Sequence, residues 1–160
     1  MDDGAVGEVE VSAEAVALAG LEPVHYREGF GFTTRERLSA EAWARRILEG
    51  SSWSQRAKML AAWRLLGVGL APLKAPGQVL GWRIQRSDPE VVVLAVRAAA
   101  GCSVRLVLRA EPGRVTHAML VRYDTVLGRL VWTRFAPAHR RFYVDLLDRA
   151  RRAGHEPLPS

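Results

Sequence analysis

The last quarter of the chain predicts one long amphipathic helix, and this helix constrains the fold more than any other segment. Residues 127–152 read LGRLVWTRFAPAHRRFYVDLLDRARR, with apolar side chains recurring at steps of three and four. At about 1.5 Å per residue the helix would be roughly 39 Å long, enough to cross a small domain. Pro137 removes a backbone donor, so we expect a kink at residues 133–136 or a break there into two helices. The apolar face is predicted to contain Leu127, Val131, Phe135, Ala138, Phe142, Leu146 and Ala150.

Before this helix, four segments alternate between apolar and polar residues, which is typical of strands with one buried face. They cover residues 78–87, 90–98, 102–111 and 114–124, and the short turns between them predict antiparallel pairing. An earlier strand is predicted over residues 24–34. Two helices should follow it, the first capped by Ser39 and the second by Ser52 or Ser54. The order predicts an α+β fold in which a curved antiparallel sheet grips the long C-terminal helix.

Length and composition favour one domain with its own core, which we place at residues 23–153 of 160. Residues 1–22 contain six acidic residues and no Lys or Arg. We expect them to form an acidic tail that either folds back on the basic body or is disordered, and residues 154–160 to form a second tail. The chain shows no signal-peptide pattern, no membrane span and a single cysteine, so we expect a cytoplasmic protein.

The chain is basic, with a formal net charge of +6 and far more Arg than Lys. A basic body can bind nucleic acid or anionic lipid, but such binders concentrate their charge in patches. Here the arginines are scattered along helices and strands. The pattern therefore favours a solvated basic surface over nucleic-acid binding.

Element order and two short motifs resemble the START/polyketide-cyclase superfamily, also called SRPBCC, whose members have the helix-grip fold. The C-terminal motif is similar to that of a bacterial family of unknown function, with Gly128-Arg129 and then Pro137-Ala138-His139. In the first strand, Tyr26, Glu28 and Phe30 are similar to that family's Tyr, acid and Phe. The resemblance implies a sheet wrapped around the long helix, with a cavity between them. Members of the superfamily bind lipids, sterols, polyketides or hormones, and some cyclise or dehydrate substrates.

His117 is the strongest candidate for chemistry, because alternation places it on the same strand face as Val115 and Tyr123. If that face meets the cavity, His117 with Tyr123 and Glu28 would form a set suited to general acid–base work. A buried, hydrogen-bonded polar cluster is the structural alternative. His139 is a second candidate for acid–base or ligand contact, although it can equally satisfy a carbonyl freed near Pro137.

The remaining candidates are apolar side chains able to line a pocket for a lipophilic ligand. No metal motif or nucleotide-binding loop occurs, so no cofactor is expected, and Cys102 is interpreted as a small buried hydrophobe. The predicted ligand-binding residues are Trp82, His117, Met119, Tyr123, Trp132, Phe135, His139 and Phe142.

Three functions are therefore compatible with the sequence. The first is a module that binds a lipophilic small molecule between the sheet and the final helix. The second is a cyclase- or dehydratase-type enzyme that uses His117 with Tyr123 or Glu28, although no catalytic signature occurs. The third is an interaction protein with a basic outer surface, and a homodimer is open. The arginines of that surface would be Arg97, Arg105, Arg109 and Arg122.

Overall fold

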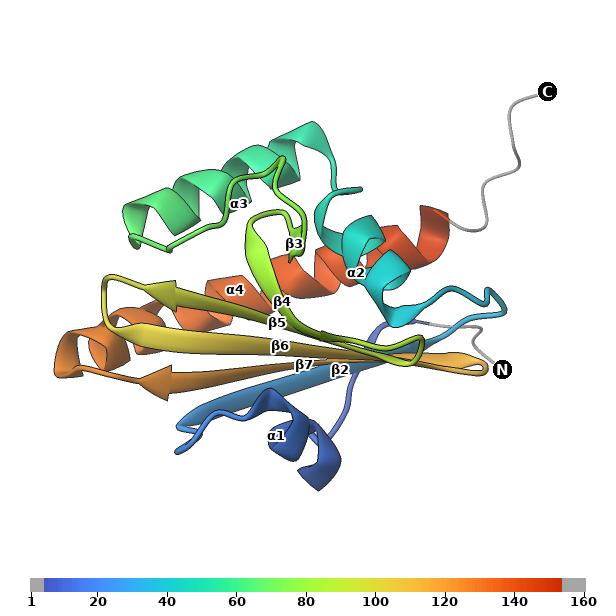
Figure 1. The fold of residues 1–160 in the computed structure, drawn as a ribbon, viewed down its shortest axis with the longest axis horizontal. Helices are drawn as coiled ribbons and strands as arrows, with labels where there is room; N and C mark the ends of the chain where they lie inside the picture. Colours follow the sequence, from blue (N-terminus) through green and yellow to red (C-terminus); the bar gives the residue numbers. More distant parts are fainter. Residues whose placement is uncertain (1–4, 154–160) are drawn as a thin grey trace.

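The computed structural model describes residues 5–153, which form one seven-stranded antiparallel sheet with helices on both faces (Figure 1). The strands lie in the order β1-β2-β7-β6-β5-β4-β3. Their bounds are β1 Gly7–Glu8, β2 Tyr26–Thr33, β3 Gln78–Val79, β4 Trp82–Ser87, β5 Val91–Ala98, β6 Cys102–Glu111 and β7 Arg114–Tyr123. The helices are α1 Ala13–Ala19, α2 Ala40–Leu48, α3 Trp53–Leu65 and α4 Val126–Ala153. The predicted α+β class, antiparallel sheet and long C-terminal helix are confirmed.

Local side-chain chemistry starts the two helices that follow β2. The hydroxyl of Ser39 accepts a hydrogen bond from the backbone N–H of Ala42, which caps α2. Ser52 caps α3 and forms a reciprocal capping box with Gln55. Ser52, and not Ser54, is therefore the N-cap residue of α3.

Helix α4 continues without interruption through Pro137, so the alternative of a break into two helices is wrong. Pro137 itself lies on the exposed side of the helix, where its ring displaces no packed side chain. On the buried side, Trp132 and Ala136 precede it and Tyr143 follows it. Packing of both halves against the same sheet offsets the one hydrogen bond that the proline cannot donate.

The buried face of α4 is rotated relative to the face that the periodicity predicts. Leu127 is 59% exposed, whereas its neighbour Gly128 is buried. A Cβ atom at Gly128 would lie 2.0 Å from the carbonyl oxygen of Gly101, so only glycine fits this contact between α4 and the β5–β6 turn. The close approach turns Gly128 towards the sheet and Leu127 towards solvent. The buried residues are Gly128, Trp132, Ala136, Tyr143, Leu146, Leu147 and Ala150.

The described part of residues 1–22 packs on the sheet. β1 pairs with β2, and α1 lies on the opposite side of the sheet from α2 and α3 (Figure 1). Ala15 and Ala19 of α1 pack with Leu120 in a separate hydrophobic cluster on the outer face. Glu14 pairs with Arg109, so the acidic segment folds back on the basic body. The predicted tail over residues 154–160 lies outside the described residues.

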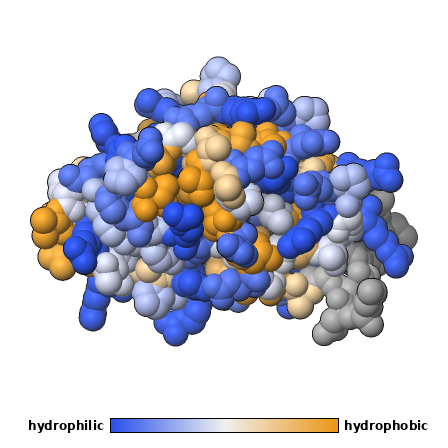
Figure 2. All heavy atoms as spheres, turned by 90° about the horizontal axis from the view of Figure 1, so that it is seen from below, coloured by the Kyte–Doolittle hydropathy of each residue, from blue (hydrophilic) through white to orange (hydrophobic). Residues whose placement is uncertain are grey.

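Seen from the α1 side, the molecule is mainly hydrophilic, with apolar atoms near the middle and at the end where α4 begins (Figure 2). The latter agree with the exposed side chains of Val126, Leu127 and Leu130. None of the helices in residues 5–153 combines the length and the apolar character needed to cross a bilayer.

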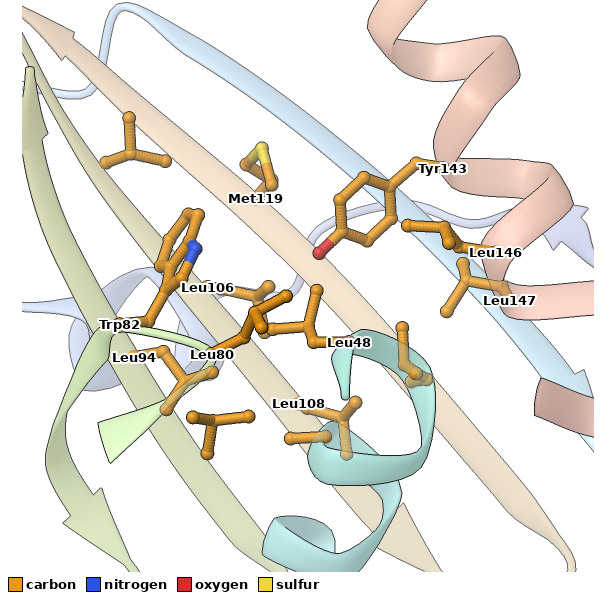
Figure 3. Packing of buried hydrophobic residues seen from close by; sticks show 14 of the residues in the cluster. Leu48, Leu80, Trp82, Leu94, Leu106, Leu108, Met119, Tyr143, Leu146 and Leu147 are labelled. Atoms are coloured by element: carbon orange, nitrogen blue, oxygen red, sulfur yellow. The ribbon is translucent and has the colours of Figure 1, made fainter. Parts of the chain in front are cut away.

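The main core lies between the inner face of the sheet and the helices α2 and α4. Alternate residues of β5 and β6, including Leu94 and Leu106, point into it and meet Leu48 of α2. Leu146 and Leu147 enter from α4, and Tyr143 points its hydroxyl towards the middle of the cluster (Figure 3). This packing fixes α4 across the inner face, and with it every side chain that α4 presents to the sheet.

Candidate functional site

An apolar cavity of about 210 Å³ opens between α3 and α4, with Trp82 of β4 in its wall. A smaller space of about 50 Å³ continues from it between α4 and the sheet, and includes Met119 and Trp132 in its lining. The two spaces share four side chains, so they are adjacent compartments of one cleft. Those shared residues are Trp63, Trp82, Phe135 and His139.

The cavity exists because α3 does not pack closely on α4. Met59 is the only fully buried residue of α3, and the indole of Trp63 contacts that of Trp82 edge-on at 5.9 Å between ring centroids. Large aromatic side chains therefore hold α3 away from the sheet. Space remains beneath them, walled on the other side by Phe135 and Phe142 of α4.

A buried polar cluster adjoins the cavity, centred on the carboxylate of Glu28, which is 3% exposed. The hydroxyl of Tyr26 donates a hydrogen bond of 2.7 Å to Glu28 Oε2. Nδ1 of His139 lies 3.1 Å from Glu28 Oε1, an ion-pair distance if the imidazole is protonated, although the two atoms are not aligned as a hydrogen bond. His139 lines both compartments, so it connects the cavity to the buried carboxylate.

Strand register explains why these groups meet. Tyr26, Glu28 and Phe30 alternate onto one face of β2, and residues paired across an antiparallel ladder share a face. Glu28 pairs with Met119 and Phe30 pairs with His117, so His117 is a diagonal neighbour of Glu28 on the inner face. His139 reaches the same place from α4, above the sheet. The polar neighbour of the His139 imidazole is the carboxylate of Glu28. A carbonyl freed near Pro137 is therefore not needed to explain the position of His139.

The surroundings of Glu28 favour its ionised form. Burial by itself would raise the pKa of the carboxyl, but His139, the hydroxyl of Tyr26 and the more distant His117 together outweigh that effect. The pKa of Glu28 therefore lies below its ordinary range. A carboxylate held ionised beside an imidazole can accept a proton from the imidazole or orient it.

His117 is 1% exposed and packs against Tyr143 with the two rings tilted, at 4.5 Å between the ring centroids. Neither ring nitrogen of His117 has a hydrogen-bond partner among residues 5–153. Burial lowers the pKa of His117 to about 4, so the imidazole is neutral at pH 7. Burial likewise raises the pKa of Tyr143, whose hydroxyl also lacks a partner within the described chain.

The structure distributes the predicted site residues over four places. Trp82, Phe135, His139 and Phe142 line the larger compartment, and Met119 and Trp132 line the smaller one. His117 lies deeper and is in the lining of neither.

Tyr123 is not brought to Glu28 or His117. It stacks on His25 with 5.0 Å between the ring centroids, near the end of β7. Tyr123 is four residues from Met119, the partner of Glu28, which is about 13 Å along a strand. Tyr123 therefore does not join His117 and Glu28 in the predicted acid–base set.

Other residues complete the site where Tyr123 does not. Tyr26 contacts Glu28 directly, and Tyr143 lies between His117 and His139. The sequence contains the signal for both: Tyr26 is two residues from Glu28 on one strand face, and Tyr143 is four residues from His139 on one helix face. On the cavity wall, Met59 and Trp63 of α3 are likewise absent from the predicted set.

Within residues 5–153, no group of three or more His, Cys, Asp or Glu side chains is arranged to hold a metal ion. No protein-family model matches the chain, and no curated protein matches it. Among solved structures, the chain is similar to CalU16 from Micromonospora echinospora, at 10% sequence identity and a TM-score of 0.29. That match covers 96% of this chain and 98% of CalU16. A similarity at this TM-score carries no argument about family or function.

Proposed function

We propose that this protein binds a lipophilic small molecule in the cleft between α3, α4 and the sheet. The apolar cavity of about 210 Å³ that ends at a buried acid–imidazole pair carries the proposal. An apolar cavity of about 150 Å³ in another protein holds benzene, so this space suits a ligand of about two fused rings. Burial of its apolar surface would supply most of the affinity.

Unpaired donors in the cleft indicate the polar part of that ligand. The indole N–H groups of Trp82 and Trp132 and the hydroxyl of Tyr143 are buried and have no hydrogen-bond partner among residues 5–153. A buried donor without a partner costs roughly 1–3 kcal/mol, and a bound acceptor can recover part of that cost. These groups support a ligand with a carbonyl or hydroxyl oxygen on an otherwise apolar frame.

A cavity-filling variant tests the proposal, with 2-naphthol as the probe in titration calorimetry. Ala62 lines the cavity, and its neighbour Ala61 on α3 is exposed, so Ala62→Trp fills the space while Ala61→Trp adds the same side chain to the surface. We expect saturable binding by the natural chain and by Ala61→Trp, and at least about tenfold weaker binding by Ala62→Trp. Equal affinity in all three proteins, or no saturable binding by the natural chain, would contradict the proposal.

Proton-transfer catalysis is the second candidate function, favoured by the distance of 3.1 Å between Glu28 and His139 beside the cavity. Cyclisation and dehydration both need a group that removes a proton and returns it, and an ionised carboxylate next to an imidazole can do so. His117 has no part in this version, because its imidazole reaches neither compartment.

Deuterium incorporation separates catalysis from binding. The probe is 2-tetralone, a two-ring ketone whose carbons next to the carbonyl exchange hydrogen when a base removes it. We expect faster exchange in D₂O with the natural chain than with Glu28→Gln, and full activity in Glu14→Gln, an exposed carboxylate on α1. If Glu28→Gln binds 2-tetralone and exchanges it as fast as the natural chain does, catalysis by this pair is refuted.

A further inference from the structure

Four arginines gather on the outer face of the sheet, in two rows that cross its strands. In the first row, Arg83 of β4, Ala95 of β5 and Arg105 of β6 are aligned by register. The second row consists of Arg97 of β5, Ser103 of β6 and Arg122 of β7. In each row a small residue separates two arginines. We call these four arginines the outer arginine cluster.

The rows form a hollow with basic walls. Adjacent strands lie about 4.8 Å apart, so the two arginines of each row start about 10 Å from each other. Because the side chains of Ala95 and Ser103 are short, they leave space between the two arginines of each row. Residues of both rows line a surface hollow of about 540 Å³, and Gly67 and Gly69 line it as well. A small ion in the hollow can therefore be reached from several sides by long guanidinium side chains.

The positive charge of the cluster is largely uncompensated. Among residues 5–153, Asp124 is the one carboxylate that forms an ion pair with the cluster, and it pairs with Arg122 at 2.7 Å. Arg83, Arg97 and Arg105 form no ion pair with a carboxylate of the described chain. The Nε atom of Arg105 is buried without a hydrogen-bond partner there. Burial, followed by the charges of Arg122 and Arg97, lowers the pKa of Arg105, which agrees with crowded like charges.

Elsewhere in the described chain, five of the six partly buried arginines pair with acids, and the sixth, Arg56, donates to backbone carbonyls. The pairs are Arg45 with Glu41, Arg46 with Glu36, Arg109 with Glu14, Arg140 with Glu8 and Arg151 with Asp148. A scattered, solvated basic surface explains isolated arginines. It does not by itself explain why arginines from four neighbouring strands converge on one hollow.

We propose that the outer arginine cluster binds a phosphate-bearing anion. Guanidinium groups recognise phosphate through paired, charge-assisted hydrogen bonds. A single carboxylate would neutralise one arginine, whereas a phosphate monoester carries nearly two negative charges and a diphosphate carries more. The hydroxyl of Ser103 lines the same hollow but donates to Asp124, so the arginines themselves would supply the donors for the anion. The site is on the face of the sheet opposite α3, so it is independent of the function proposed for the cleft.

Pyrophosphate is the probe for this site, with binding measured by titration calorimetry at about 0.15 M salt, where non-specific surface attraction is screened. The test variant is Arg97→Gln with Arg105→Gln. Its matched control is Arg64→Gln with Arg134→Gln, which removes two exposed charges from α3 and α4. We expect saturable binding by the natural chain and the control, and at least about tenfold weaker binding by the test variant. Equal weakening in both variants would overturn the proposal, because it would show attraction to net charge alone.

Vesicle sedimentation identifies the source of the phosphate. Phosphatidylcholine vesicles with and without phosphatidic acid are mixed with the same three proteins. Selective capture by phosphatidic acid that the test variant loses would support the site with a lipid headgroup as its ligand. Binding of pyrophosphate without capture supports a soluble phosphate compound. Absence of saturable binding in both assays, or tight binding to duplex DNA alone, overturns the proposal.

Discussion

Acidification should destabilise this protein through His117, whose imidazole is buried and has no hydrogen-bond partner in the described chain. Burial lowers its pKa from the ordinary value of 6.5 to about 4. Below pH 6.5 the unfolded chain therefore binds a proton that the native protein excludes. By linkage, the free energy of unfolding falls as the pH drops from about 6.5 towards 4. Glu28, His139 and Tyr143 face this imidazole, and the carboxylate of Glu28 opposes part of the burial effect.

The size of the effect follows from the two pKa values. The difference between 6.5 and about 4 corresponds to about 3 kcal/mol when the pH is below both values. Between pH 7 and pH 5 the loss amounts to about 2 kcal/mol, since most of the protonation of the unfolded chain occurs in that interval. This is a large part of the stability of an ordinary domain.

Urea unfolding followed by tryptophan fluorescence at pH 7 and pH 5 measures this loss for the natural chain and two variants. His117→Leu removes the titrating group at similar volume, whereas His25→Gln replaces an exposed histidine. We expect His117→Leu to lose about 2 kcal/mol less than the natural chain between the two pH values, and His25→Gln to lose about as much as the natural chain. If all three proteins lose the same free energy, the argument from a buried neutral imidazole is refuted.

Three further changes test contacts within the fold. Gly128→Ala should lower the free energy of unfolding by at least about 2 kcal/mol, because its Cβ would meet the carbonyl oxygen of Gly101 at 2.0 Å. An increase of about 1 kcal/mol in the free energy of unfolding, as at an exposed helical glycine, would refute that contact. Leu147→Ala removes a fully buried side chain and should cost about 2–5 kcal/mol in chemical denaturation, and a loss below about 1 kcal/mol would contradict its placement. Tyr26→Phe removes the hydrogen bond to Glu28, so the pKa of that carboxyl should rise in a carbon NMR titration, and an unchanged pKa would exclude the bond.

Periodicity alone was enough to predict the long helix and most of the strands of this protein. Helix α4 starts and ends within a residue of its predicted bounds, and the strands β5 to β7 match three of the alternating segments closely. The single strand predicted over residues 78–87 is wrong, because a turn at Leu80 and Gly81 divides it into the antiparallel pair β3 and β4. The serine caps of α2 and α3 were also readable, because capping depends on residues within one turn of the helix. These features are local, so neighbouring residues suffice to determine them.

The arrangement of those elements depended on contacts that no local pattern contains. Gly128 sets the rotation of α4 through its approach to Gly101, and α1 settles on the outer face because apolar strand residues remain uncovered there.

In the candidate site too, local pattern predicted the face on which a residue lies, and long-range contacts determined which residues meet. Alternation placed Glu28 and His117 on the inner faces of their strands, where the structure has them. It also placed Tyr123 on an inner face, but the register of β2 against β7 leaves Tyr123 about four residues beyond the partner of Glu28. His139 meets Glu28 because α4 crosses the sheet at that position. The sequence by itself determined which face of each element is apolar. Tertiary structure decided which faces meet and in what register, since those depend on packing between residues far apart in the chain.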